Sequence, residues 1–233
     1  MAQWTLSTEE WAAVALSVKV ATVAMLASLP FGILVAMVLA RWRFAGKSLF
    51  DGLVHLPLIL PPVVTGYLLL ILFGRRGPVG AFLYDAFGIV LSFRWTGAAL
   101  ACAVMGFPLM VRVIRVAIET VDLRLEQAAG TLGASPSWVF VTVTLPLILP
   151  GVIGGAILAF AKAMGEFGAT ITFVSNIPGL TQTLPSAIYS YTQVPGGDLQ
   201  ALRLTLVSII VSLAALMASE WLVRRTARRL GDG

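Results

Sequence analysis

Residues 119–138 read ETVDLRLEQAAGTLGASPSW and lie between two long apolar runs. Four residues in this stretch follow the i, i+3, i+4, i+7 spacing that places side chains on one face of a helix. They are Leu125, Ala128, Ala129 and Leu132. Asp122 can cap the start of this helix, and Gly133 suits the left-handed turn that ends it. Ser135-Pro136 then predicts the start of another helix. The stretch therefore predicts a short amphipathic helix, a sharp turn and a new long helix.

The apolar runs on either side are long enough to cross a membrane, and similar runs occur elsewhere in the chain. A transmembrane helix needs about 20 mainly apolar residues. Five segments reach or approach this length: about 12–40, 51–73, 95–117, 139–165 and 202–223. Only 12% of the 233 residues are charged, whereas a soluble domain has about 25%. The sequence therefore predicts an all-α, polytopic membrane helix bundle that forms a single transmembrane domain over residues 1–233.

Prolines and glycines indicate where these spans deviate from straight, isolated helices. Two adjacent prolines, Pro61-Pro62, are expected to kink or locally unwind the second span. Gly151 and Gly155 form a small-xxx-small pair that permits close approach of another helix, although such a pair also arises by chance in a glycine-rich chain. The segment 166–201 begins with an apolar run too short to cross and contains several prolines. We interpret it as a partly re-entrant segment or a structured outer cap; a sixth crossing is the less favoured alternative.

The basic residues predict the orientation, because loops rich in Lys and Arg stay in the cytoplasm. The larger group comprises Arg41, Arg43, Lys47, Arg112, Arg115, Arg124, Arg224, Arg225, Arg228 and Arg229. The smaller group, on the other side, comprises Arg75, Arg76, Arg94 and Arg203. Five spans then place the N-terminus outside, the C-terminus inside, and the loop of about 119–136 with its short helix on the cytoplasmic face.

An amphipathic helix on the cytoplasmic face has two interpretations. It can lie in the lipid interface, or it can dock into a groove of another protein. Its face is rich in alanine and offers little bulk or basic charge for holding lipid. These small residues favour docking.

The same stretch resembles a known family signature. Glu126-x-Ala128-Ala129-x-x-x-Gly133, followed by Val143-x-Leu145-Pro146, is similar to the EAA motif of permeases in binding-protein-dependent ABC importers, with Val143 in place of the more usual Ile. The resemblance implies the five-span core of a type I (MetI-like) importer permease and identifies the short helix as the coupling helix that docks on an ATPase subunit. The residues that the resemblance assigns to ATPase coupling are Glu126, Ala128, Ala129, Leu132, Gly133, Leu145 and Pro146.

Three further segments, 55–67, 107–112 and 165–178, resemble the molybdate permeases of this family. The sulfate permeases share the EAA pattern but resemble 165–178 less closely. The resemblance implies import of molybdate across the cytoplasmic (inner) membrane, with tungstate, sulfate or thiosulfate as alternatives. The implied partners are a second copy of the chain, two cytoplasmic ATP-binding subunits, a periplasmic or extracellular molybdate-binding protein and the lipid bilayer, with no role for nucleic acid.

Several function classes find little support in the sequence. Gly46-Lys47-Ser48 resembles part of a nucleotide-binding loop, but a P-loop needs glycine where Arg41 stands. We therefore expect no cofactor on this chain, with ATP and Mg²⁺ on the partner subunit. The chain has one His, His55, and one Cys, Cys102, which argues against a metal centre or a catalytic set and hence against an enzyme. A stand-alone anion channel would need a continuous polar stripe along a span, and none is visible.

Ionisable residues inside a membrane indicate a functional role, because placing a charge there costs free energy. Lys162 and Glu166 are four residues apart and can simply pair with each other, or Lys162 can lie near the anion path. Hydroxyl groups suit a path that must release its ion, and the break at Pro61-Pro62 can aim backbone N–H groups at it. The candidates for the translocation path are Thr65, Lys162, Glu166, Thr170 and Thr172, with Ser175 as a further hydroxyl.

Overall fold

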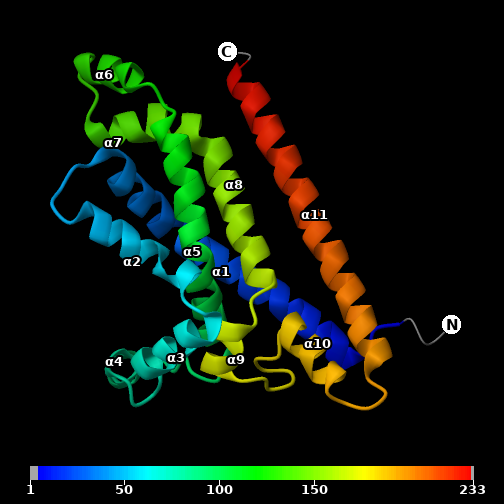
Figure 1. Cartoon of the computed structure of the whole chain (residues 1–233). Helices are drawn as coiled ribbons and strands as arrows, with labels where there is room; N and C mark the ends of the chain where they lie inside the picture. Colours follow the sequence, from blue (N-terminus) through cyan, green and yellow to red (C-terminus); the bar gives the residue numbers. More distant parts are fainter. Residues whose placement is uncertain (1–4, 232–233) are drawn as a thin grey trace.

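The described part of the chain is built from helices that run between two ends of a bundle. A computed structural model describes the backbone of residues 5–231 and the side chains of residues 5–218 and 220–222. The first helix, α1, spans Thr8–Arg41 and begins with a capping box, in which Ser7 and Glu10 each bond the other's backbone N–H. Figure 1 shows α1 crossing the whole molecule obliquely.

The second predicted span is broken in two. Helix α2 spans Lys47–Ile59, helix α3 spans Pro62–Phe73, and their axes are bent by 113°. Pro61 is the N-cap of α3 and Pro62 its first residue, and neither has a backbone N–H with which to continue α2. The predicted kink at Pro61-Pro62 is confirmed, and it is much sharper than a bend within one helix. A further helix that the sequence analysis did not predict, α4 at Pro78–Phe87, follows α3.

The motif stretch folds as its residues predict. After α5 (Trp95–Glu119), Asp122 caps α6 (Leu123–Thr131) by accepting a hydrogen bond from the Arg124 N–H. Gly133 has a φ of 87°, the left-handed conformation that suits glycine. Ser135 then caps the next helical run. This run consists of α7 (Pro136–Val139), the π-helical segment η2 (Phe140–Thr144) and α8 (Leu145–Met164).

The segment 166–201 is a structured region at one end of the bundle. It contains two short helices, α9 (Gly168–Val174) and α10 (Leu184–Thr192), before α11 (Asp198–Gly231) begins. Within residues 5–231, four helical runs are long and apolar enough to cross a membrane, and the bent α2–α3 pair gives up to five. Neither α9 nor α10 is among them. The segment thus has the form of a cap beside α3, with which α9 packs.

The centre of the bundle is formed by α1, α5 and α8, and small residues bring α5 and α8 together. A Cβ added at Gly106 would lie 3.2 Å from the Ala159 carbonyl oxygen. A Cβ at Gly155 would lie 3.1 Å from the Met110 carbonyl oxygen, and one at Gly151 would collide with Ala117. The predicted close approach at Gly151 and Gly155 is therefore confirmed, and α5 is the partner helix.

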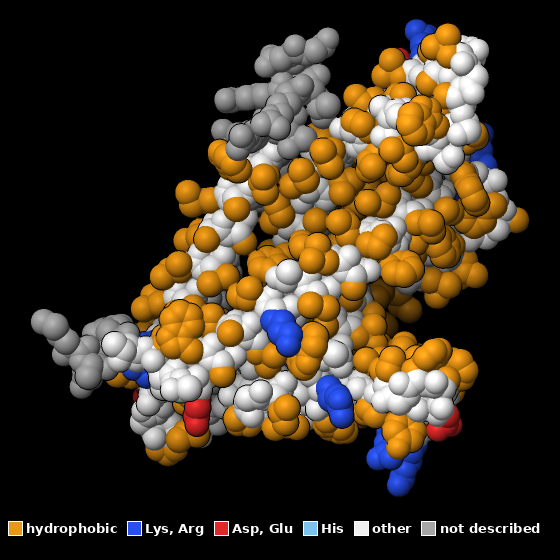
Figure 2. All heavy atoms as spheres, turned by 180° about the vertical axis from the view of Figure 1, so that it is seen from behind, with side chains coloured by type: hydrophobic (Ala, Val, Ile, Leu, Met, Phe, Trp, Pro, Cys, Tyr) orange, Lys and Arg blue, Asp and Glu red, His pale blue; other side chains and the backbone are white. Residues whose placement is uncertain are grey.

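The outside of the bundle is largely apolar, as expected for a surface in contact with lipid. Figure 2 shows hydrophobic side chains over most of one face, with only scattered basic groups. In the apolar stretch of α5, 61% of the residues are buried, whereas 11% are buried in the apolar stretch of α11. Helix α5 is thus an inner helix, and α11 exposes most of its apolar surface.

Two ion pairs show which segments lie at the same end of the bundle. Arg203, near the start of α11, pairs with buried Glu10 at 2.8 Å and donates to the Thr5 carbonyl oxygen. Arg41, at the other end of α1, pairs with Glu126 of α6. The start of the described chain and α6 therefore lie at opposite ends of the bundle (Figure 1). The side chains of Arg224, Arg225, Arg228 and Arg229, used above to predict orientation, lie outside the described residues.

The close contact between α3 and α9 yields a stability prediction. A Cβ at Gly66 would lie 2.5 Å from the Ala169 carbonyl oxygen and 2.9 Å from the Thr172 Cβ. Gly66→Val should therefore destabilise the purified chain by roughly 1–3 kcal/mol through overpacking. Gly52→Val is the matched control, because a Cβ at Gly52 meets nothing within 4 Å. The midpoint of thermal unfolding in detergent checks this, and equal midpoints for the two variants would contradict the packing.

Candidate functional site

Helix α6 presents a leucine-bearing surface that the chain itself leaves uncovered. Leu125 is 50% exposed and Leu132, at its C-cap, is 89% exposed. Ala128 is exposed beside them, and Ala129 is half-buried. The face predicted from the apolar spacing is thus present. Exposed leucines on a short helix beyond the end of the bundle form a surface that a protein groove can bind.

Glu126, also on α6, points back toward the bundle. Its Oε1 accepts a hydrogen bond from Arg41 Nη2 at 2.8 Å and another from Thr144 Oγ1 at 2.9 Å. Arg41 ends α1, and Thr144 ends the π-helical segment. The family resemblance assigned Glu126 to ATPase coupling. The sequence analysis missed both partners, because Arg41 lies 85 positions away in the chain.

The remaining motif residues lie below α6, at the entry of the fourth span. Leu145 and Pro146 begin α8 and are half-buried. A cavity of about 460 Å³ separates α6 from this entry, with Arg41, Glu126 and Thr144 in its wall. The motif residues therefore form two groups, one on α6 and its turn and the other, Leu145 and Pro146, at the start of α8, with the cavity between them.

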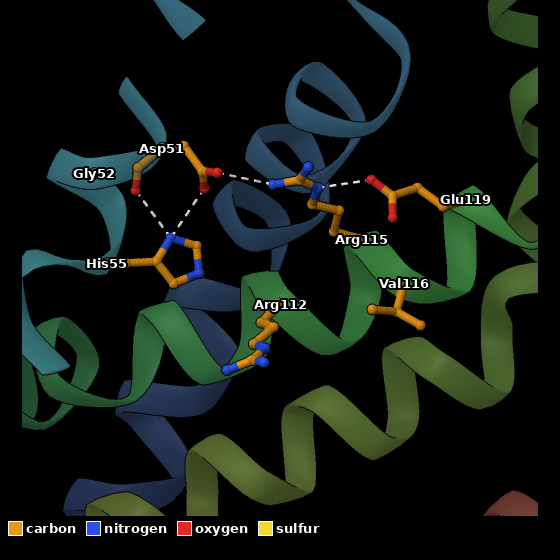
Figure 3. Close-up of a pocket in the computed structure, with 7 residues that line it drawn as sticks. All are labelled: Asp51, Gly52, His55, Arg112, Arg115, Val116 and Glu119. Carbon is orange, nitrogen blue, oxygen red and sulfur yellow. Dashed lines mark hydrogen bonds and ion pairs between the residues drawn. The ribbon is translucent and has the colours of Figure 1, made fainter. Parts of the chain in front are cut away.

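A charged pocket of about 370 Å³ lies between α2 and α5 (Figure 3). Arg115 Nη1 donates to Asp51 Oδ2 at 3.0 Å, and its Nε donates to Glu119 Oε1 at 2.8 Å. His55 Nδ1 lies 3.1 Å from Asp51 Oδ1. Arg112 also lines the pocket, and its side chain points away from Arg115 in Figure 3. This pocket was missed by the sequence analysis, which treated both arginines only as orientation signals; the i, i+4 spacing of Asp51 and His55 was the available hint.

The intramembrane pair Lys162–Glu166 is formed. Lys162 Nζ donates to Glu166 Oε2 at 2.6 Å, and the Glu166 Oε1 accepts from the Ala169 N–H at 3.0 Å. The Glu166 side chain is 1% exposed, whereas that of Lys162 is 30% exposed. The predicted pairing is confirmed. Both carboxylate oxygens of Glu166 thus accept hydrogen bonds, whereas the Lys162 side chain is only partly buried.

The candidate hydroxyls gather around the same junction of α3, α8 and α9. Thr170 Oγ1 donates to the Phe167 carbonyl oxygen at 2.9 Å, and Thr172 Oγ1 donates to the Gly168 carbonyl oxygen at 2.8 Å. Thr65 precedes Gly66, which contacts α9, and its buried Oγ1 has no hydrogen-bond partner among the described residues. Two of the three candidate threonines therefore donate to local backbone, whereas the Lys162 side chain is partly exposed and donates to Glu166.

Comparison with known proteins assigns the chain to a family. Residues 28–230 match the model of the family described as the binding-protein-dependent transport system inner membrane component. The chain is 59% identical over 226 residues to the molybdenum transport system permease protein ModB of Escherichia coli (strain K12), which covers 97% of this chain and 99% of that protein. It is 57% identical over 224 residues to the protein of the same name from Haemophilus influenzae, with coverage of 96% and 98%.

The fold is also that of a solved transporter. A bacterial alginate ABC transporter, crystallised with its pentasaccharide-bound periplasmic protein, matches with a TM-score of 0.75 at 16% identity, over 96% of this chain and 81% of that one. The helix bundle, the break in its second span and the motif on α6 thus occur in a chain whose sequence matches one family model over most of its length. This chain belongs to the family of binding-protein-dependent transport system inner membrane components.

Proposed function

We propose that this chain is the membrane-spanning permease of an ATP-driven importer that moves molybdate across the cytoplasmic membrane. The observation that supports this best is the 59% identity, over nearly the full length of both chains, to a protein named as a molybdenum transport permease. Tungstate, sulfate or thiosulfate would be alternative cargoes, because all are tetrahedral or near-tetrahedral oxyanions. A stand-alone anion channel is less supported, since the relatives are named as parts of transport systems.

The energy for transport would come from partner subunits. In this proposal two copies of the chain form the pathway, and two cytoplasmic subunits that bind ATP and Mg²⁺ dock on the two α6 helices. The exposed Leu125 and Leu132 support this, because they offer apolar surface for a groove to bury. An external binding protein would deliver the anion; the alginate transporter was likewise solved with its periplasmic protein.

Transport would follow from the movement of the coupling helices. Closure of the ATPase subunits on ATP would bring the paired α6 helices together and open the pathway to the outside. Hydrolysis and product release would return the pathway to the inside. This orientation requires α6 on the cytoplasmic face, with the N-terminus outside and the C-terminus inside, as the distribution of basic residues predicts.

Lys162 is the residue that we place nearest the anion. Its ammonium group has three donors and gives one to Glu166, so that a passing dianion can accept from the others without being held by a full ring of charge. Glu166, Thr170 and Thr172 would shape this part of the path by fixing α9, and Thr65, whose buried hydroxyl has no partner among the described residues, would lie beside them on α3.

Cells that lack this chain test the cargo. Their uptake of labelled molybdate, measured against excess sulfate, should fall to the level of passive entry, and the cloned chain should restore it. If the deleted strain loses sulfate uptake instead, the cargo is sulfate and not molybdate. Undiminished molybdate uptake in the deleted strain would refute it.

Gly133→Val tests the role of the α6 turn. The φ of 87° at Gly133 is unfavourable for a β-branched residue, so the substitution should displace the end of α6 and uncouple or dissociate the complex. The control is Gly130→Ala, within α6, where a Cβ meets nothing within 4 Å. Co-purification of the ATPase subunit and ATP-dependent uptake in proteoliposomes are the measurements. Normal uptake by Gly133→Val would defeat the idea.

Single cysteines test the orientation. In a Cys102→Ser background, Ala45→Cys lies in the exposed turn after α1 and Leu180→Cys in the exposed turn after α9. A membrane-impermeant maleimide should label Leu180→Cys in intact spheroplasts and Ala45→Cys only after permeabilisation. The reverse pattern would invert the proposed topology.

A further inference from the structure

Helix α6 is joined to the bundle by few contacts. Figure 1 shows it beyond the ends of α5 and α8. It packs against α7 and η2, the segments that follow it in the chain. Among the described residues, the side-chain hydrogen bonds between α6 and the rest of the bundle end on one group, the Glu126 carboxylate. A force applied to α6 therefore reaches the bundle through the covalent chain, through its packing on α7 and η2, and through this carboxylate.

One oxygen of Glu126 joins three segments that are far apart in the sequence. Oε1 accepts from Arg41 at the end of α1 and from Thr144 at the junction of η2 and α8, at 2.8 and 2.9 Å. Thr144 is 2% exposed, and the side chains of Arg41 and Glu126 are 17% and 21% exposed. Charge-assisted hydrogen bonds that are this sheltered from water are stronger than exposed ion pairs. We call these contacts the Arg41–Glu126–Thr144 link.

The segment that Glu126 holds departs from regular α-helical geometry. Residues Phe140–Thr144 form a π-helix, and the Leu145 N–H bonds to the Phe140 carbonyl oxygen, five residues back. Such segments are rare and occur frequently at functional sites, because their wider turn is less regular than the flanking α-helix. The cavity of about 460 Å³ beside the link gives α6 space in which to shift. A pull on Thr144 thus acts where the fourth span is least regular.

We propose that Arg41 and Thr144 are positioning residues for coupling: they hold Glu126 inward, so that movement of α6 is delivered to the end of α1 and to the start of α8 together. This proposal rests on the proposed function, because it assumes that an ATPase subunit moves α6. It assigns Glu126 to the bundle, whereas docking is left to the outward face that carries Leu125 and Leu132. The opposite assignment, in which Glu126 binds the ATPase subunit, leaves Arg41 without a role in coupling.

The first experiment measures the link in the purified chain. Thermal unfolding midpoints are compared for Arg41→Gln, Glu126→Gln and the double variant. Each single change should lower the midpoint, and the double variant should lose less than the sum of the two single losses, because both changes remove the same Arg41–Glu126 contact. Losses that simply add would overturn the link.

The second experiment measures coupling in the reconstituted complex with its ATPase subunits and binding protein. Arg41→Gln should keep the ATPase subunits bound but lower the molybdate transported per ATP hydrolysed on the order of tenfold, the effect of losing a charge-assisted hydrogen bond. Thr144→Val, which removes only the hydroxyl, should act in the same direction, whereas Thr144→Ser should retain coupling. Arg43→Gln is the matched control, because Arg43 is an exposed arginine two residues further on.

Two results separate this proposal from its alternatives. If Arg41→Gln and Thr144→Val transport as the wild type while Glu126→Gln loses the ATPase subunits, Glu126 is a docking residue and the proposal is overturned. If the wild-type complex shows no ATP-dependent molybdate uptake, the proposed function fails instead. In that case the unfolding measurements still test the Arg41–Glu126–Thr144 link. Additive losses overturn the link, and a less than additive loss in the double variant supports it.

Discussion

The structure depends on the requirement that each backbone N–H and C=O group at membrane depth find a partner within the protein. Helices meet most of this requirement through their own backbone bonds, and α1, α5 and α8, each of which stays helical through one internal proline, form the centre of the bundle. The break at Pro61 is the exception. Beyond the break, Gly66 and Gly168 let α3 and α9 pack backbone to backbone, whereas Pro61 and Pro62 themselves stay exposed. Glycine at positions 66 and 168 is thus a condition for the packing of α3 on α9.

The sequence predicted local structure well, because the signals are local. Asp122, Gly133 and Ser135 each bond or bend within a few residues, and the structure has α6, its turn and the next helix where they indicate. Pro61-Pro62 marked the break for the same reason, although not the angle, which is set by packing against α9.

The rest of the site could not be predicted, because it depends on contacts between distant segments. The pairing of Glu126 with Arg41 requires knowing that α1 ends beside α6, which no local pattern contains. Asp51 and Arg115 likewise meet across two helices. The hydroxyls of Thr170 and Thr172 donate to nearby backbone carbonyl oxygens, and this depends on side-chain rotamers rather than on sequence spacing.

The glycine contacts between α5 and α8 have a mechanical consequence. Gly106, Gly151 and Gly155 bring the second half of α5 into close contact with the middle of α8, and α6 with its turn lies in the connection between the two helices. A close-packed interface resists sliding, since sliding would drive side chains into the opposite backbone. In the proposed mechanism α5 and α8 would therefore move together, so that a displacement at the α6 end would tilt both helices and shift their far end, beside α9.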